Sequence, residues 1–168
     1  MSTSSRREGA APAASPEVTE IERALARITY LRARHRQHDR LMALAEVSLD
    51  RAAVALLRQV ADCDAVRPGE LAARLGVEAS HVTRMVQHLQ RSGYVTRVPD
   101  PDDRRARRIG LTEAGRSAVE RVRAASARSM QAALADWSPE ELQQLATLFH
   151  RMVDDFSAQA AERETARA

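Results

Sequence analysis

Four arginines fall within five positions near the middle of this 168-residue chain: Arg104, Arg105, Arg107 and Arg108. A guanidinium group stays charged at physiological pH and donates hydrogen bonds from a planar fork, which matches the oxygens of a phosphate. The run from Pro99 to Asp103, directly before them, has the composition of a turn. The cluster therefore predicts a basic tip that binds an anion, with nucleic acid as the first candidate.

A second set of polar side chains lies upstream, on a helix expected over Ala79 to Arg91. Its outward side chains can all donate hydrogen bonds and none is acidic: Ser80, His81, Thr83, Arg84, Gln87, His88 and Arg91. Such groups read base edges in the major groove of DNA. The alternative is an ordinary helical hairpin with a polar outer face.

The net charge of +3 is unevenly distributed along the chain. Residues 1–73 carry a net +1, residues 74–128 a net +6 and residues 129–168 a net −4. The basic segment contains both the arginine cluster and the polar helix. This distribution favours a localised anionic partner, although an arginine-rich solvated face has the same composition.

Composition and length limit the class of protein. The chain is long enough for one sizeable domain or two small ones, and its hydrophobic fraction of 44%, rich in Ala and Leu, favours helices. The longest apolar run, Ala52 to Leu57, is far too short to span a membrane. The N-terminal residues lack the apolar stretch of a secretion signal, and a single cysteine, Cys63, excludes an internal disulfide framework. We expect a cytoplasmic, nucleoid-associated protein with no membrane contact.

The elements that must position the polar residues are mostly helices. Residues 1–14 lack apolar periodicity and are expected to be a disordered tail. Ser15 and Pro16 begin a long amphipathic helix that runs on toward His35 and His38. The expected order thereafter is a helix from about 48 to 61, helices over 68–75 and 79–91, a hairpin with strands near 94–98 and 107–111, a helix from 112 to about 134 and a last helix from 138.

The run from Gly69 to Leu89 has the layout of a helix-turn-helix. Ala72 is small enough for two helices to cross closely, and Gly76 can adopt the positive φ of a tight turn. The apolar faces that lock the two helices are expected to comprise Leu71, Leu75, Val77, Val82, Met85 and Leu89. A two-stranded ribbon with a basic tip beside this pair can reach the adjacent minor groove, where arginine is favoured.

Two runs resemble the multiple antibiotic resistance regulator (MarR) family of bacterial winged-helix repressors. They are LAARLGVEASHVTRMVQHLQRSG (Leu71 to Gly93), similar to the helix-turn-helix, and RSGYVTRVPDPDDRRARRIGLTEAG (Arg91 to Gly115), similar to the wing. The wing match is the more specific, because Asp-x-Arg is followed by Leu-Thr-x-x-Gly. The resemblance extends over about residues 17–160.

The resemblance implies a mainly α fold with a small β-hairpin wing. It places a winged helix-turn-helix DNA-binding domain at 48–112 and a discontinuous helical dimerisation region at 15–47 and 113–165. It further implies a homodimeric repressor that binds palindromic double-stranded operator DNA and is released by a small-molecule effector. Apolar stripes on the first and last helices, which a small DNA-binding lobe cannot cover, agree with a dimer.

The resemblance also implies roles for individual residues. In the wing, Arg105 enters the minor groove and Asp103 orients it through a charge-assisted hydrogen bond. The arginines expected to contact phosphates are Arg104, Arg107, Arg108 and Arg97. The positions that match base-facing ones are Ser80, His81, Thr83 and Arg84, and Gln87 and His88 lie on the same face.

The effector site is unknown from the sequence. Tyr30, His35 and His38 are candidates to line it. The two histidines, with Asp39, could instead hold a divalent metal, but they lack a complete ligand set, and we expect no metal and no cofactor.

Cys63 could be a peroxide-sensing thiol. The neighbouring Asp62 and Asp64 raise rather than lower the pKa of a thiol, which favours a small apolar residue at a helix end. Because Cys63 and the two histidines are nevertheless present, a metal- or redox-responsive regulator of the same fold is the first alternative to the ligand-released repressor.

No catalytic constellation stands out, so we do not expect an enzyme. The chain has neither a recognisable Ser-His-acid arrangement nor a phosphate-binding glycine loop. A helical protein-interaction module that binds no DNA is the second alternative. Such a module gains little from four clustered arginines, whereas a DNA-binding protein gains directly.

Overall fold

The computed structural model describes residues 14–103 and 105–166. All but the last residue of the expected tail at 1–14, and the wing residue Arg104, lie outside the described residues. The chain divides into two compact units, Met1–Ala125 and Ser126–Ala168. The first unit contains every element that could position the predicted DNA-binding residues.

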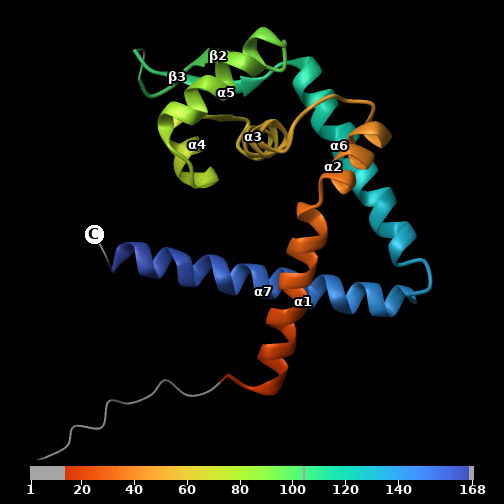
Figure 1. The fold of residues 1–168 in the computed structure, drawn as a ribbon. Helices are drawn as coiled ribbons and strands as arrows, with labels where there is room; N and C mark the ends of the chain where they lie inside the picture. Colours follow the sequence, from red (N-terminus) through yellow and green to blue (C-terminus); the bar gives the residue numbers. More distant parts are fainter. Residues whose placement is uncertain (1–13, 104, 167–168) are drawn as a thin grey trace, which may run out of the picture. The chain divides into compact units, whose positions relative to one another are not determined.

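The described part of the chain is mainly helical with one small sheet, which confirms the predicted fold class. The elements in chain order, all but β1 labelled in Figure 1, are α1 (Pro16–Ala33), α2 (His35–Ala45), α3 (Arg51–Asp62), β1 (Ala65–Val66), α4 (Pro68–Leu75), α5 (Ala79–Arg91), β2 (Val95–Pro99), β3 (Arg107–Leu111), α6 (Glu113–Ala133) and α7 (Pro139–Thr165). None of the helices within residues 14–103 and 105–166 combines the length and the apolar character that a membrane-spanning segment requires.

The first helix is shorter than predicted. It ends at Ala33, because Arg34 takes an extended conformation (φ −66°, ψ 130°) and α2 begins at His35. The break allows α2 to bury Met42 and Ala45 in a small core that α6 completes. A single helix continuing the apolar stripe of α1 was therefore the wrong prediction for residues 34–38.

Several predicted helix ends are confirmed by their capping hydrogen bonds. The Ser15 hydroxyl accepts the backbone N–H of Val18 at 3.4 Å, at the start of α1. Before α7, the Glu141 N–H donates to the Ser138 hydroxyl at 3.2 Å while the Ser138 N–H donates to the Glu141 carboxylate at 2.8 Å. This reciprocal pair is the capping box that the sequence predicts.

The sheet has three antiparallel strands in the order β1-β3-β2, so β3 is central. The predicted hairpin is confirmed, with Val95 opposite Leu111 and Pro99 opposite Arg107. The two-residue strand β1 was not predicted; it pairs Ala65 with Gly110 on the other edge of β3.

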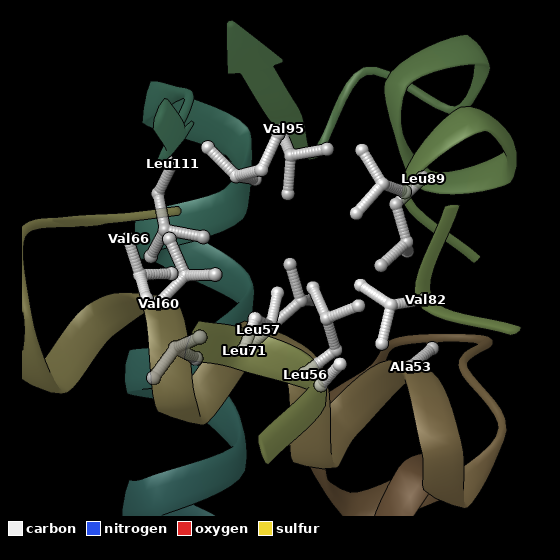
Figure 2. Close-up of a cluster of buried hydrophobic side chains, with 14 residues drawn as sticks. Ala53, Leu56, Leu57, Val60, Val66, Leu71, Val82, Leu89, Val95 and Leu111 are labelled. Carbon is white, nitrogen blue, oxygen red and sulfur yellow. The ribbon is translucent and has the colours of Figure 1, made fainter. Parts of the chain in front are cut away.

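The main core lies between α3, α4, α5 and the sheet (Figure 2). Its largest fully buried side chains are Leu56, Leu57, Val60, Val66, Leu71, Val82, Leu89 and Ile109. Val77 was predicted to belong to this core but is 38% exposed, and Val86 is buried in it. The reason is geometric: Val86 lies one turn from both Val82 and Leu89 on α5, whereas Val77 lies in the turn before that helix.

The Leu-Thr-x-x-Gly motif joins the wing to α6. The Thr112 hydroxyl donates to the Gly93 carbonyl at 2.6 Å and accepts the Gly115 N–H at 3.0 Å, so it caps α6 and holds the two ends of the wing together. A Cβ at Gly115 would lie 2.0 Å from the Tyr94 carbonyl oxygen. Only glycine lets α6 begin against the start of the wing.

We predict that Gly115→Ala lowers the free energy of unfolding by about 3 kcal/mol or more, because backbone has to move to admit the methyl group. Chemical denaturation followed by circular dichroism measures this. Gly69→Ala is the matched control, since a Cβ there meets nothing within 4 Å. It should leave stability unchanged or raise it by up to about 1 kcal/mol. Equal effects of the two substitutions would contradict the packing argument.

Candidate nucleic-acid interface

Helix α5 has one buried face and one exposed polar face. Val82, Val86 and Leu89 hold the helix on the core. The predicted base-reading residues are all exposed: Ser80, His81, Thr83, Arg84, Gln87 and His88. The first turn of the helix carries no acidic residue. The structure therefore presents these side chains together on the outer surface of the helix-turn-helix.

A groove of about 690 Å³ lies at the turn between α4 and α5. Its lining residues are Ala72, Ala73, Gly76, Val77, Glu78, Ser80, His81 and Arg84. Gly76 has φ +63° and ends α4 in the left-handed conformation, as the sequence predicts. Small residues on α4 leave the first turn of α5 accessible, which opens the surface around Ser80, His81 and Arg84.

Thr83, one of the residues predicted to contact bases, already uses its hydroxyl hydrogen in a hydrogen bond within α5. Thr83 Oγ1 donates to the Ala79 carbonyl at 2.9 Å. The oxygen keeps acceptor capacity and the methyl group remains available for apolar contact, for instance with a thymine methyl. Arg84 and His81, by contrast, carry the donors that the first turns of α5 can offer to a base edge.

The wing extends beyond the sheet between Pro99 and Arg107. Arg105 and Arg107 are exposed at its tip, and Arg97 is exposed on β2. Arg104 lies outside the described residues. The structure therefore brings three of the predicted wing cations onto one exposed hairpin, next in sequence to α5.

Asp103 shapes the tip through the main chain. Its carboxylate accepts the backbone N–H of Arg105 at 2.9 Å, and its carbonyl accepts the N–H of Ala106 at 3.0 Å. Among the described ion pairs, none joins Asp103 to the Arg105 guanidinium. The predicted orientation of that guanidinium by Asp103 stays a prediction for the DNA complex.

The base of the wing contains a buried carboxylate that the sequence reasoning missed. The side chain of Asp100 is fully buried, and its Oδ2 accepts Arg67 Nε at 2.6 Å and Arg108 Nε at 3.0 Å. Its Oδ1 accepts Arg108 Nη2 at 3.3 Å and the Asp102 N–H at 2.9 Å. Arg67 stands immediately before α4, whereas Arg108 belongs to β3, so one carboxylate joins the wing to the helix-turn-helix.

These contacts shift the pKa values of all three groups. The hydrogen bond from Arg67, and then that from Arg108, hold the pKa of Asp100 well below its usual range, although burial acts in the opposite direction. The hydrogen bond to Asp100 in turn raises the pKa of both Arg67 and Arg108. The network is therefore ionised throughout the physiological range.

Arg108 lies in a different environment from the other wing arginines. It was expected to contact phosphate, yet its side chain is 27% exposed and donates to both Asp100 and Asp102. Nothing local in the sequence marks this arrangement, because Arg67 lies 33 residues before Asp100. The composition of the run around Asp100 indicated a turn and no more.

The effector candidates lie around the break between α1 and α2. Tyr30 is 65% exposed, with the Arg34 guanidinium 5.2 Å from the centre of its ring. His35 is exposed, while the His38 ring lies 2.8 Å from the Leu49 carbonyl oxygen through Nε2. No group of three or more His, Cys, Asp or Glu side chains within 14–103 and 105–166 could hold a metal ion.

Cys63 ends α3 and is partly buried. Its sulfur lies 2.6 Å from Nη1 of Arg74, a residue of α4. The contact links the ends of two helices, as a small residue at a helix terminus can do.

The fold and this exposed interface define a winged helix-turn-helix protein. The sequence model of the MarR family matches residues 49–106, which contain the helix-turn-helix and most of the wing. The chain belongs to the MarR family of transcriptional regulators.

Individual relatives agree with that assignment. An uncharacterized HTH-type transcriptional regulator of Bacillus subtilis (strain 168), YdgJ, is 30% identical over 97 residues, 58% of this chain and 59% of that protein. The match thus spans well under two thirds of the curated relative's length. Transcriptional regulator Tm0710 from Thermotoga maritima is 30% identical with a TM-score of 0.63, covering 83% of this chain and 98% of that one.

A MarR family protein from Bacillus stearothermophilus has a similar fold. It superposes with a TM-score of 0.75 over 86% of this chain and 99% of its own, at 21% sequence identity. At that level of identity the comparison establishes the fold alone.

We predict that Asp100→Asn lowers stability near neutral pH. The folded-state pKa of Asp100 lies below the ordinary value of 3.8, so its contribution is fully present above that value and is lost as the pH falls below it. The urea midpoints of wild type and variant should therefore differ near pH 7 and converge as the solution is acidified. Asp102→Asn, which changes a side chain that is 75% exposed, is the matched control. A midpoint difference independent of pH would contradict the assignment.

Proposed function

We propose that this chain is a sequence-specific, double-stranded DNA-binding transcriptional regulator that acts as a homodimeric repressor. The observation that carries the proposal is the pairing of two surfaces in one unit: the exposed, acid-free face of α5 and the exposed arginines of the wing. The first surface suits the major groove and the second suits phosphates and the minor groove. A protein-interaction module has no use for both together.

Within this proposal each surface has a distinct task. Ser80, His81 and Arg84 stand where the groove at the α4–α5 turn is open, and they read base edges together with Thr83, Gln87 and His88. Arg105 enters the minor groove, with Asp103 shaping the loop that carries it. Arg97, Arg104 and Arg107 contact phosphates and supply the salt-dependent part of the affinity.

A dimer is supported by apolar side chains that a single chain leaves in water. On α1, Val18, Ile21, Ile28 and Leu31 are each about half exposed. On α7 the apolar side chains that are between 36% and 57% exposed are Leu142, Leu145, Leu148, Phe149, Val153 and Phe156. Exposed apolar stripes of this length mark a protein–protein interface, and a two-fold dimer matches a palindromic operator.

A small-molecule effector that releases DNA completes the proposal. The exposed Tyr30 and His35 lie close in sequence to His38, whose contact with the Leu49 carbonyl joins α2 to the segment before α3. A ligand held there would act on the connection to the DNA-binding elements.

A thermal-shift screen identifies small molecules that bind the protein, and the effector is the one that abolishes the gel shift with DNA. Tyr30→Ala should abolish the response to that molecule.

The DNA-binding proposal predicts that Arg105→Ala weakens binding to a labelled duplex from the region flanking the protein's own gene by about tenfold or more. It should also reduce the slope of log K against log salt by about one, because one fewer counterion is released. Fluorescence anisotropy at several salt concentrations measures both. Arg23→Ala, which removes an equal charge from α1, is the control. Unchanged affinity of Arg105→Ala would rule out the wing assignment, and absence of wild-type binding would rule out the function.

The dimer proposal predicts a mass of twice 18.6 kDa by light scattering at micromolar concentration. Phe149→Glu should shift the population toward monomer, because it places a charge in the apolar stripe of α7. Gln143→Glu, a charge on the opposite face of the same helix, should leave the dimer intact. A wild-type monomer at this concentration would refute the proposal.

A further inference from the structure

We propose that Asp100 is a positioning residue for DNA binding: its buried carboxylate fixes the wing to the helix-turn-helix and so sets where Arg105 meets the DNA. The inference rests on the proposed DNA-binding function. It assigns a role to a residue that itself has no surface to offer to DNA, since Asp100 is only 3% exposed.

The first argument is that Asp100 joins two elements far apart in the sequence. Arg67 fixes the carboxylate to the start of α4, and Arg108 fixes it to the central strand β3. Charge-assisted hydrogen bonds at 2.6 and 3.0 Å restrict both distance and direction. β1 pairs only with Gly110 and Ile109, so the hairpin is two-stranded from Arg108 to the tip, and the attachment through Asp100 restrains that part against bending.

The second argument is that Asp100 also closes the loop at the wing tip. Its carboxylate accepts the N–H of Asp102, and its own N–H donates to the Ala106 carbonyl at 3.3 Å. Arg105 lies between these two attachment points. The carboxylate and the backbone N–H of Asp100 therefore fix the loop on both sides of Arg105.

The third argument concerns Arg108. Its guanidinium donates to Asp100 through Nε and Nη2 and to Asp102 through Nη2 at 3.1 Å. Arg105 and Arg107 are exposed, whereas Arg108 is directed to the base of the wing. Of these three arginines, Arg108 holds the wing and leaves the other two for DNA.

The charge of Asp100 makes the inference unusually easy to test. A carboxylate repels DNA phosphates, so simple electrostatics predicts that its neutralisation strengthens binding. A positioning role predicts the opposite sign. The most basic segment of the chain, residues 74–128, thus retains an acid whose removal should weaken the affinity for an anion.

The experiment measures anisotropy of a fluorescein-labelled duplex from the DNA flanking the protein's own gene, with full-length wild type, Asp100→Asn, Glu120→Gln and Arg105→Ala. Asp100→Asn should weaken binding about tenfold or more. Glu120→Gln makes the same charge change on an exposed residue of α6 in the same basic segment, and binding should be equal or tighter. In the double variant Asp100→Asn, Arg105→Ala the two losses of affinity should add only in part, because a displaced wing has already lost the Arg105 contact.

Each outcome separates the inference from the proposed function. Wild-type binding with equal or tighter binding by Asp100→Asn overturns the positioning role and leaves the function intact. Weaker binding that adds fully to Arg105→Ala also overturns it, since Asp100 would then act elsewhere than through the wing. Wild type that binds no duplex overturns the function and the inference together.

A second variant covers the case in which Asp100→Asn does not fold, as judged by circular dichroism. Arg67→Gln removes the attachment to α4 and leaves the Arg108 contacts in place. Its loss of affinity should likewise add only in part to that of Arg105→Ala. Full additivity of Arg67→Gln and Arg105→Ala would overturn the proposal.

Discussion

One buried carboxylate holds the wing of this protein to its helix-turn-helix. The side chain of Asp100 is fully buried, and its carboxylate accepts hydrogen bonds from Arg67, which precedes α4, and from Arg108 on β3. A buried charge is costly unless it is paired and hydrogen-bonded, and here both arginines that pair with it come from other parts of the fold, one before α4 and one on β3. The relative placement of the two surfaces proposed for DNA depends on this interaction.

Around that interaction, the arginines of the wing and of its attachment to α4 divide into two kinds. Arg67 and Arg108 are bound to an acid and act within the protein, whereas Arg97, Arg105 and Arg107 are exposed. A charge count cannot separate these kinds, since each arginine contributes one positive charge wherever it stands. Burial and pairing decide which of them remain available to a nucleic acid.

Local features of the fold follow from the sequence because their causes are local. The capping box at Ser138 and Glu141, the left-handed Gly76 and the alternation of the hairpin each arise from a few neighbouring residues. The polar face of α5 is equally local, because helical periodicity alone separates it from Val82 and Leu89.

The features that escaped prediction have causes elsewhere in the chain. The helical spacing of Ile21, Leu25, Ile28 and Leu31 leads on to His35 and His38, and neither Pro nor Gly marks the break at Arg34. Packing of α2 on α6 favours that break. Strand β1 has two residues and exists because β3 pairs with it. From the sequence alone Asp100 is a turn residue, because its partner Arg67 lies 33 residues earlier in the chain. Predicting such a contact requires the three-dimensional structure.

Hydroxyl-radical and methylation footprints of the wild-type protein on its operator test the central claim most directly, since they report which groove is contacted at each base pair. The account predicts two major-groove contact regions about one helical turn apart, each accompanied by a minor-groove contact where the wing lies. Protection confined to one kind of groove, or to the sugar-phosphate backbone with no fixed register, would contradict it.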